Sequence, residues 1–196
     1  MSTTQPIRSR ELLDKFKTYY DSQNPNPRNK TLILLGLNTA LRISDVLRIK
    51  WKDVFDEENN QIKEHLEIRE MKTRKKQTIA LNDFIRHNLY TYKEYIFCLS
   101  PYDKEQYLFV SRKGKNVPIC RSQAYRIIKQ AAEAVGLPSH ISCHSLRKTF
   151  GYHACKQGIS PALLMDIYNH SSYKITKRYL CIEQDERDEV YRNINL

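Results

Sequence analysis

The 196-residue sequence has no apolar run close to the roughly 20 residues of a membrane-spanning helix, no Cys-x-x-Cys pair and no internal repeat. Its five cysteines are an odd number and no signal peptide opens the chain, so we expect reduced thiols and a cytoplasmic protein. Cys143, His144, His153 and Cys155 are close in sequence, but their spacing matches no common zinc module. These absences disfavour a membrane protein, a disulfide-rich domain and a zinc module.

Positive charge is in clear excess over negative charge. Lysine and arginine number 33 against 22 aspartates and glutamates, which gives a formal net charge of +11. Such an excess favours a polyanionic partner, and nucleic acid is the commonest one. On charge alone, a basic soluble protein without such a partner is an equal alternative.

Residue periodicity predicts a mainly α-helical protein with one small antiparallel β-sheet, an α+β fold. Asn26 and Pro27 supply an N-cap and a first-turn proline for one helix, and Ser44 is the predicted cap of the next. Alternating apolar residues predict strands at 62–70 and 77–81, with a basic turn between them. The other predicted elements are a helix after residues 82–83, a strand at 107–110, and helices from 122 to about 136, at 145–157 and from 161 to about 169.

Two motifs carry side chains that suit a phosphate. Arg42 falls in Leu41-Arg42-Ile43-Ser44, a tight corner between two predicted helices. His144 and Arg147 are three residues apart at the start of a helix, near one face and beside free backbone N–H groups. Those groups and the helix dipole attract phosphate, and a guanidinium grips two of its oxygens. Taken singly, Arg42 is equally a structural corner arginine and His144–Arg147 a solvated pair.

A third motif lies near the C-terminus, where His170 precedes Tyr179 by nine residues. Taken singly, His170 is equally a helix-capping histidine, and Tyr179 is one of 13 tyrosines, most of which are expected to pack. Together with the first two motifs, they form a set that can attack a phosphodiester without a metal ion. The arginines and one histidine hold the phosphate, a second histidine moves a proton, and the tyrosine oxygen takes the phosphoryl group.

In order and interval these residues resemble the catalytic domain of the tyrosine recombinases, the phage-integrase family of DNA strand-exchange enzymes. The resemblance covers about residues 28–180. Arg42 matches the first arginine of the family's Leu-Arg-Ile-Ser segment, and His144 and Arg147 match its His-x-x-Arg motif. His170 matches the third phosphate-side position and Tyr179 the nucleophile.

Two positions of the resemblance are less regular. Asn169 replaces the family's glycine, and asparagine is the next-best residue for a left-handed helix-end turn. Lys72 matches the family's catalytic lysine, although other cations share its turn and an ordinary phosphate contact is the alternative. Further DNA contacts are expected from Arg74, Lys75, Lys76 and Lys177.

The resemblance implies a site-specific recombinase that needs no metal, nucleotide or other cofactor. Tyr179 attacks a DNA phosphodiester, leaves a 3′-phosphotyrosyl link and expels a 5′-hydroxyl. His144 accepts or relays the tyrosine proton, Lys72 protonates the leaving oxygen, and cationic neighbours are expected to favour the phenolate. No carboxylate cluster suited to two magnesium ions accompanies these residues, which argues against a metal-dependent nuclease.

We expect one catalytic domain over residues 1–196, with an acidic tail at 181–196 that docks on a neighbouring subunit or folds back. The N-terminal DNA-clamping domain of longer family members is expected to be absent. The chain is then either an excised fragment or a short recombinase like those that invert fimbrial promoters.

The expected partners are double-stranded DNA, further copies in a homotetramer on DNA (a monomer when free) and accessory DNA-bending proteins of the nucleoid. Alternatives are a type IB topoisomerase and a catalytically silent DNA-binding module. The target sequence, and the choice among integration, excision and inversion, do not follow from the residues.

Overall fold

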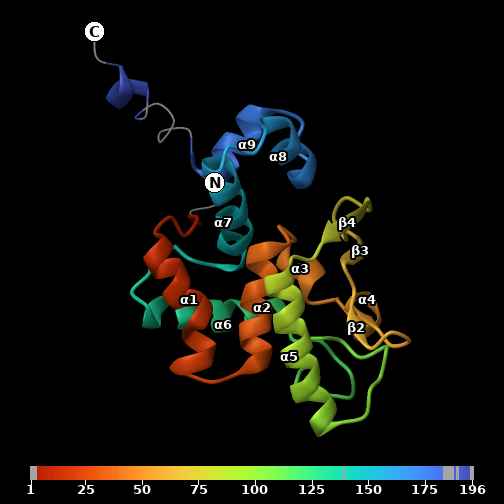
Figure 1. Cartoon of the computed structure of the whole chain (residues 1–196). Coiled ribbons are helices and arrows are strands. Elements are labelled where there is room, and N and C mark those ends of the chain that lie inside the picture. The colour runs from red at the N-terminus through yellow and green to blue at the C-terminus, as the bar shows by residue number, and fades with distance from the viewer. Residues whose placement is uncertain (1–3, 139, 183–187, 189, 195–196) are drawn as a thin grey trace.

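The computed structural model describes residues 4–138, 140–182, 188 and 190–194. The chain is mainly helical with short antiparallel strands, as predicted (Figure 1). Its elements are α1 (Arg10–Ser22), α2 (Pro27–Asn38), α3 (Ile43–Val46), α4 (Trp51–Val54), β1 (Phe55–Asp56), β2 (Gln61–Ile62), β3 (His65–Arg69), β4 (Lys76–Ala80), α5 (Asp83–Leu99), α6 (Arg121–Ala134), α7 (Cys143–Lys156), α8 (Pro161–Tyr168) and α9 (Tyr173–Leu180).

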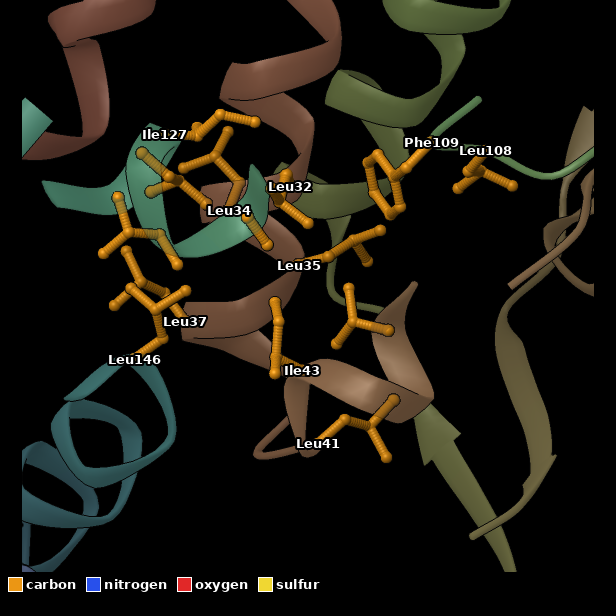
Figure 2. Close-up of a cluster of buried hydrophobic side chains, with 14 of the residues drawn as sticks. Leu32, Leu34, Leu35, Leu37, Leu41, Ile43, Leu108, Phe109, Ile127 and Leu146 are labelled. Carbon is orange, nitrogen blue, oxygen red and sulfur yellow. The ribbon is translucent and has the colours of Figure 1, made fainter. Parts of the chain in front are cut away.

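Helix α2 is the centre of the body, packed against α1, α5 and α7 (Figure 1). Leu32, Ile33, Leu34 and Leu35 are all fully buried, so the middle of the helix is enclosed on every side, as expected for a central helix. Figure 2 shows three of these side chains, Leu32, Leu34 and Leu35, in the core. It begins as predicted, because the Asn26 side chain accepts a hydrogen bond from Asn29 N (3.1 Å) and Pro27 follows.

The core starts earlier than the predicted residue 28. In α1, Phe16, Tyr19 and Tyr20 are buried, and the Tyr20 hydroxyl donates to the Ile127 carbonyl of α6 (2.9 Å). Upstream of α1, Ile7 is also buried, and its N–H donates to Thr149 Oγ1 (2.9 Å). The residues before α2 therefore belong to the same core as the rest of the chain.

The strands differ from the prediction in two ways. Residues 62–70 are not one strand, because Ile62 pairs with Phe55 in a separate two-stranded sheet. The hairpin of β3 and β4 runs from His65 opposite Ala80 to Arg69 opposite Lys76. The predicted strand at 107–110 is wrong; only isolated bridges form at its two ends. One bridge pairs with Pro118, which lacks the N–H needed to extend a ladder.

The helix after the α2 corner begins two residues earlier than predicted. Arg42 is extended (φ −70°, ψ 146°) and takes the N-cap position of α3, so Ser44 lies inside this four-residue helix and does not cap it. Ala40 has a left-handed φ of 53°, which turns the chain sharply between the two helices.

Helix α7 leads from this body to α8 and α9, which pack on a smaller apolar cluster (Figure 1). Gly151 makes that approach possible, since a Cβ there would lie 2.5 Å from both Leu180 Cδ2 and the Tyr168 hydroxyl. The acidic segment after Ile182 falls largely outside the described residues. In the described part of the chain, no helix combines the length and apolarity required to cross a membrane.

We expect Phe16→Ala to lower the free energy of unfolding by about 3–5 kcal/mol, because it removes a fully buried ring and leaves a cavity in its place. Urea unfolding followed by circular dichroism measures the change. Thr18→Ala, at an exposed position of the same helix, is the control. Equal stability of the two variants would show that α1 does not belong to the core.

Candidate active site

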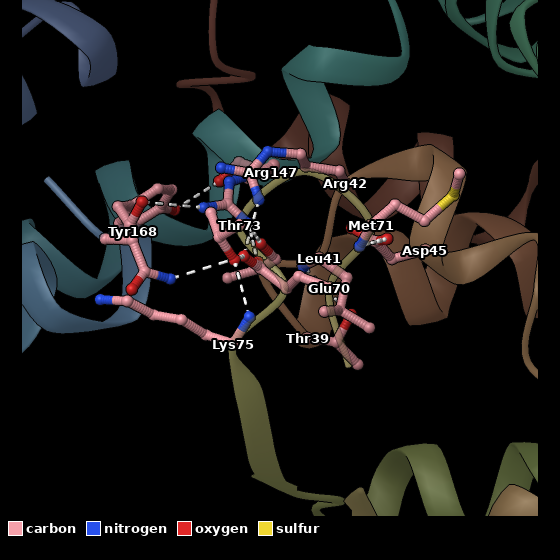
Figure 3. A network of polar contacts seen from close by, with 12 residues as sticks. Thr39, Leu41, Arg42, Asp45, Glu70, Met71, Thr73, Lys75, Arg147 and Tyr168 are labelled. Carbon is pink, nitrogen blue, oxygen red and sulfur yellow. Dashed lines mark hydrogen bonds and ion pairs between the residues drawn. The ribbon is translucent and has the colours of Figure 1, made fainter. Parts of the chain in front are cut away.

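Two arginines from distant parts of the chain meet at one carboxylate. Nη1 of Arg42 lies 2.9 Å from Oε2 of Glu70, and Nη1 of Arg147 lies 3.8 Å from its Oε1 (Figure 3). Glu70, directly after β3, is fully buried. The predicted convergence of the corner arginine with the helical arginine is therefore present in the fold.

Arg147 is almost completely enclosed, with 3% of its surface exposed. Its guanidinium donates to the Ala40 carbonyl and to the Tyr168 carbonyl (3.4 Å), and lies 4.6 Å from the centre of the Tyr168 ring. The Tyr168 hydroxyl donates in return to the Arg147 carbonyl (2.6 Å). The left-handed turn at Ala40 and the end of α8 thus hold this side chain in one orientation.

A second buried carboxylate links the Arg42 corner to the hairpin. Asp45 in α3 is 1% exposed, and its Oδ1 accepts the Met71 N–H (2.9 Å; Figure 3). Burial raises the pKa of Asp45, while the Met71 hydrogen bond opposes that shift. Neither Asp45 nor Glu70 was identified from the sequence; an acid within the basic stretch Arg69-Glu70-Met71-Lys72 was the available signal for Glu70.

His144 lies in the first turn of α7, three residues before Arg147, as predicted. Its Nε2 is 3.4 Å from Nη2 of Arg121, and because a guanidinium only donates, Nε2 must be the acceptor. Burial lowers the pKa of His144, and Arg121 is the largest of the charges that lower it further. Both effects favour a neutral imidazole, the form that can accept a proton.

Asn169 ends α8 in the left-handed conformation predicted for it (φ 54°). His170 follows, with its Nδ1 3.1 Å from the Thr176 hydroxyl. The ring centre of Tyr179, in α9, lies 5.3 Å from that of His170 and 5.4 Å from that of Tyr168. The C-terminal motif thus folds back onto the enclosed arginine.

The electrostatics of Tyr179 differ from the expectation. Burial raises the pKa of its half-buried hydroxyl, and the opposing charges of Arg147 and Arg42, with a hydrogen bond from Arg147, do not reverse the shift. The cationic neighbours do favour the phenolate, as expected, but loss of water outweighs them in the chain by itself and leaves the pKa of Tyr179 raised.

Lys72 lies in the hairpin turn, two residues after Glu70. It is exposed in the turn between β3 and β4, and among the described residues no contact joins it to Arg42, Arg147 or Tyr179. Lys75, from the same turn, lines a pocket of about 450 Å³ together with Asn169 and His170. Lys75 of this turn therefore borders the same pocket as His170.

The other candidate DNA contacts are spread around this region. Arg74 is exposed with a left-handed φ of 59°, and Lys76 begins β4 in the same hairpin. Lys177 lies in α9, its ammonium 5.2 Å from the centre of the Tyr173 ring. Within the described residues, no group of three or more histidines, cysteines, aspartates or glutamates is arranged to hold a metal ion.

Comparison with known families identifies the class to which this site belongs. The phage integrase family matches residues 8–186, nearly the whole chain. The chain therefore belongs to the phage integrase family, the tyrosine recombinases.

Individual relatives are similar over different shares of their length. The chain is 41% identical over 192 residues to the probable integrase/recombinase YoeC of Bacillus subtilis strain 168, covering 98% of this chain and 97% of that protein. It is 28% identical over 152 residues to the type 1 fimbriae regulatory protein FimE of Escherichia coli K12, covering 78% of this chain and 73% of FimE. It is 27% identical over 168 residues to the tyrosine recombinase XerD of Corynebacterium glutamicum, covering 84% of this chain but only 52% of XerD.

Solved structures share the fold at lower identity. XerA recombinase superposes with a TM-score of 0.75 at 18% identity, covering 98% of this chain and 67% of that one. XerH bound to its difH substrate superposes with a TM-score of 0.74 at 23% identity, covering 97% of this chain and 52% of that one. The predicted tyrosine-recombinase catalytic-domain fold is confirmed.

Three partly buried histidines predict how stability depends on pH. Burial lowers the pKa of His144, His153 and His170 below the ordinary value of 6.5. Below pH 6.5 the unfolded chain therefore binds more protons than the folded one, so the free energy of unfolding falls as the pH falls. We expect the melting temperature to decrease steadily from pH 7 towards pH 5.5 in calorimetry.

His153→Gln should reduce this pH dependence, because it removes one of the three groups. His87→Gln, at an exposed position of α5, is the matched control. A melting temperature that rises on acidification, or the same slope for His153→Gln as for the wild-type protein, would contradict the assignment.

Proposed function

We propose that this chain is a site-specific DNA recombinase that cuts and rejoins strands through a 3′-phosphotyrosyl intermediate. The observation that supports this best is the meeting of Arg42 and Arg147 at one carboxylate, with the Tyr179 ring packed against Tyr168, whose own ring contacts the Arg147 guanidinium. One phosphate can then touch both guanidinium groups and the attacking oxygen. YoeC, XerD and FimE carry integrase, recombinase or fimbrial-regulator names, which favours recombination over supercoil relaxation by a type IB topoisomerase.

In the proposed reaction, the Tyr179 oxygen forms a bond to the scissile phosphorus while the bond from phosphorus to the 5′-oxygen breaks. His144, neutral near pH 7, takes or relays the tyrosine proton, and a lysine of the hairpin turn gives a proton to the departing oxygen. Arg42, Arg147 and His170 stabilise the charge that develops on phosphorus. A partner strand's 5′-hydroxyl reverses these steps and reseals the DNA.

The proposed partner is double-stranded DNA, in keeping with the net charge of +11 and with basic side chains on the hairpin. XerH was solved bound to its difH substrate, and a λ integrase fragment as a dimer bound to a core site. We further propose that copies of the chain assemble as a tetramer on DNA and that DNA-bending proteins assist in the nucleoid.

Tyr179→Phe should abolish covalent capture of DNA, because it removes the only atom that attacks phosphorus in the proposed reaction. The substrate is the nicked duplex that the wild-type protein captures from a random-sequence library, and the product is a protein–DNA band resistant to detergent. Non-covalent binding of that duplex should change less than about threefold, since one hydroxyl among many phosphate contacts is lost.

Tyr95→Phe, at an exposed position of α5, is the matched control for loss of a hydroxyl. Covalent product from Tyr179→Phe at the wild-type rate would refute the assignment of the nucleophile. Failure of the wild-type protein to capture any duplex would refute the proposed function and favour a silent DNA-binding module.

The lysine that protonates the leaving oxygen can be located with a 5′-thiol leaving group, which departs without a proton. We expect Lys72→Ala to slow cleavage of the ordinary substrate by about 10²–10⁴-fold and to cleave the 5′-thiol substrate at nearly the wild-type rate. Lys75→Ala is tested in parallel because Lys75 borders the same pocket as His170. Rescue of Lys75→Ala and not of Lys72→Ala would move the general acid three residues along the turn.

A further inference from the structure

We propose that Glu70 is a positioning residue of the phosphate site: its buried carboxylate is the shared counter-ion that fixes Arg42 and Arg147 relative to each other. This role rests on the proposed function. Two alternative roles for Glu70 are a purely structural acid and an internal anion that blocks the site until DNA displaces it.

The Arg147 guanidinium and the Glu70 carboxylate are both buried charges. Arg147 and Glu70 are 3% and 0% exposed, and removing an ion from water costs several kcal/mol unless a partner and hydrogen bonds compensate. The Ala40 and Tyr168 carbonyls provide hydrogen bonds to Arg147 but no net charge. Within the described residues, the carboxylate that approaches both active-site guanidinium groups is that of Glu70.

The Glu70 side chain joins several elements of the fold. Its Oε2 accepts from the Thr73 hydroxyl (2.5 Å) and from Asn169 Nδ2 (3.5 Å), besides the ion pair with Arg42. Through Arg147 it reaches α7 as well. One side chain therefore connects the α2–α3 corner, the hairpin turn, α7 and the end of α8, which are the segments of the candidate catalytic residues other than Tyr179 in α9.

The Glu70 carboxylate is held in the site by the contacts of its backbone and of its side chain. Its N–H donates to the Lys75 carbonyl (3.0 Å), and its carbonyl accepts the Arg74 N–H (2.9 Å), so its backbone closes the hairpin turn. Displacement of the carboxylate by DNA would break the Thr73 and Asn169 contacts and leave an unpaired buried charge.

This role predicts that binding and cleavage respond differently. Glu70→Gln keeps the size of the side chain but removes the charge, so the arginines attract DNA at least as strongly while their mutual geometry loosens. Because misplacement by about 1 Å can cost 10²-fold in rate, we expect covalent capture to slow by about 10- to 100-fold. Non-covalent affinity for the same duplex should be unchanged or higher.

The experiment compares four proteins on the duplex captured by the wild-type protein: wild type, Glu70→Gln, Glu70→Asp and Glu67→Gln. Glu67 is exposed on β3 and controls for the loss of one negative charge from the same strand. Single-turnover capture gives the cleavage rate, filter binding at several salt concentrations gives the affinity, and urea unfolding gives the stability. Glu70→Asp keeps the charge on a shorter stem and should recover part of the rate.

Retained affinity with slowed capture in Glu70→Gln, partial recovery in Glu70→Asp and normal behaviour of Glu67→Gln are the expected results. Faster capture by Glu70→Gln would identify a blocking anion, and an unchanged rate would identify a dispensable one; either overturns the proposal. If Glu70→Gln does not fold, Glu70→Asp decides, because equal losses of affinity and rate in that variant would show a structural role only. Absence of capture by the wild-type protein would instead refute the proposed function itself.

Discussion

The sharing of one buried carboxylate by two arginines is the constraint on which the site depends. Guanidinium groups lose their water only when charge and hydrogen-bond acceptors replace it, and this chain supplies Glu70 together with the Ala40 and Tyr168 carbonyls. Each of these partners comes from a different segment, so the arginines are placed only when the corner, the hairpin and α8 are all in position. Formation of the phosphate site is in this way coupled to completion of the fold.

The two halves of the site are supported unequally. Arg42 and Arg147 are anchored in and beside the large core around α2, whose leucines are fully buried. Tyr179 and His170 belong to segments packed on a much smaller cluster of Ala40, Leu164, Tyr168, Leu180 and Ile182. Stability within a domain varies with local burial, so we expect α8 and α9 to open at a lower free energy than the segments that carry the arginines. Tyr168 connects the two halves through its hydrogen bond and ring contact with Arg147.

Local signals in the sequence were sufficient for much of this arrangement. The Asn26–Pro27 helix start, the left-handed Asn169 and the corner that carries Arg42 follow from short-range chemistry, and the structure has all three. Long-range features could not be derived in this way. Glu70 becomes a partner of Arg42 and Arg147, and Asp45 a partner of the hairpin, only after folding. Helix α1 likewise packs against α6, more than 100 residues away. The net direction of the Tyr179 pKa shift could not be derived either, because burial, which outweighs the cationic neighbours, is a property of the whole fold.

Burial shifts the pKa values of the proposed nucleophile and of its proposed base in opposite directions in the chain by itself. Burial raises the pKa of Tyr179 and lowers that of His144, so the gap between the two pKa values widens and proton transfer from the phenol to the imidazole becomes less favourable. Each pKa unit of that gap adds about 1.4 kcal/mol to the cost of forming phenolate and imidazolium. A phosphate beside His144 stabilises the imidazolium, and contact of that phosphate with the arginines offsets its repulsion of the phenolate. In the proposed reaction, the same burial that raises the pKa of the phenol therefore makes its activation depend on the arrival of a phosphate, which links proton transfer to substrate binding.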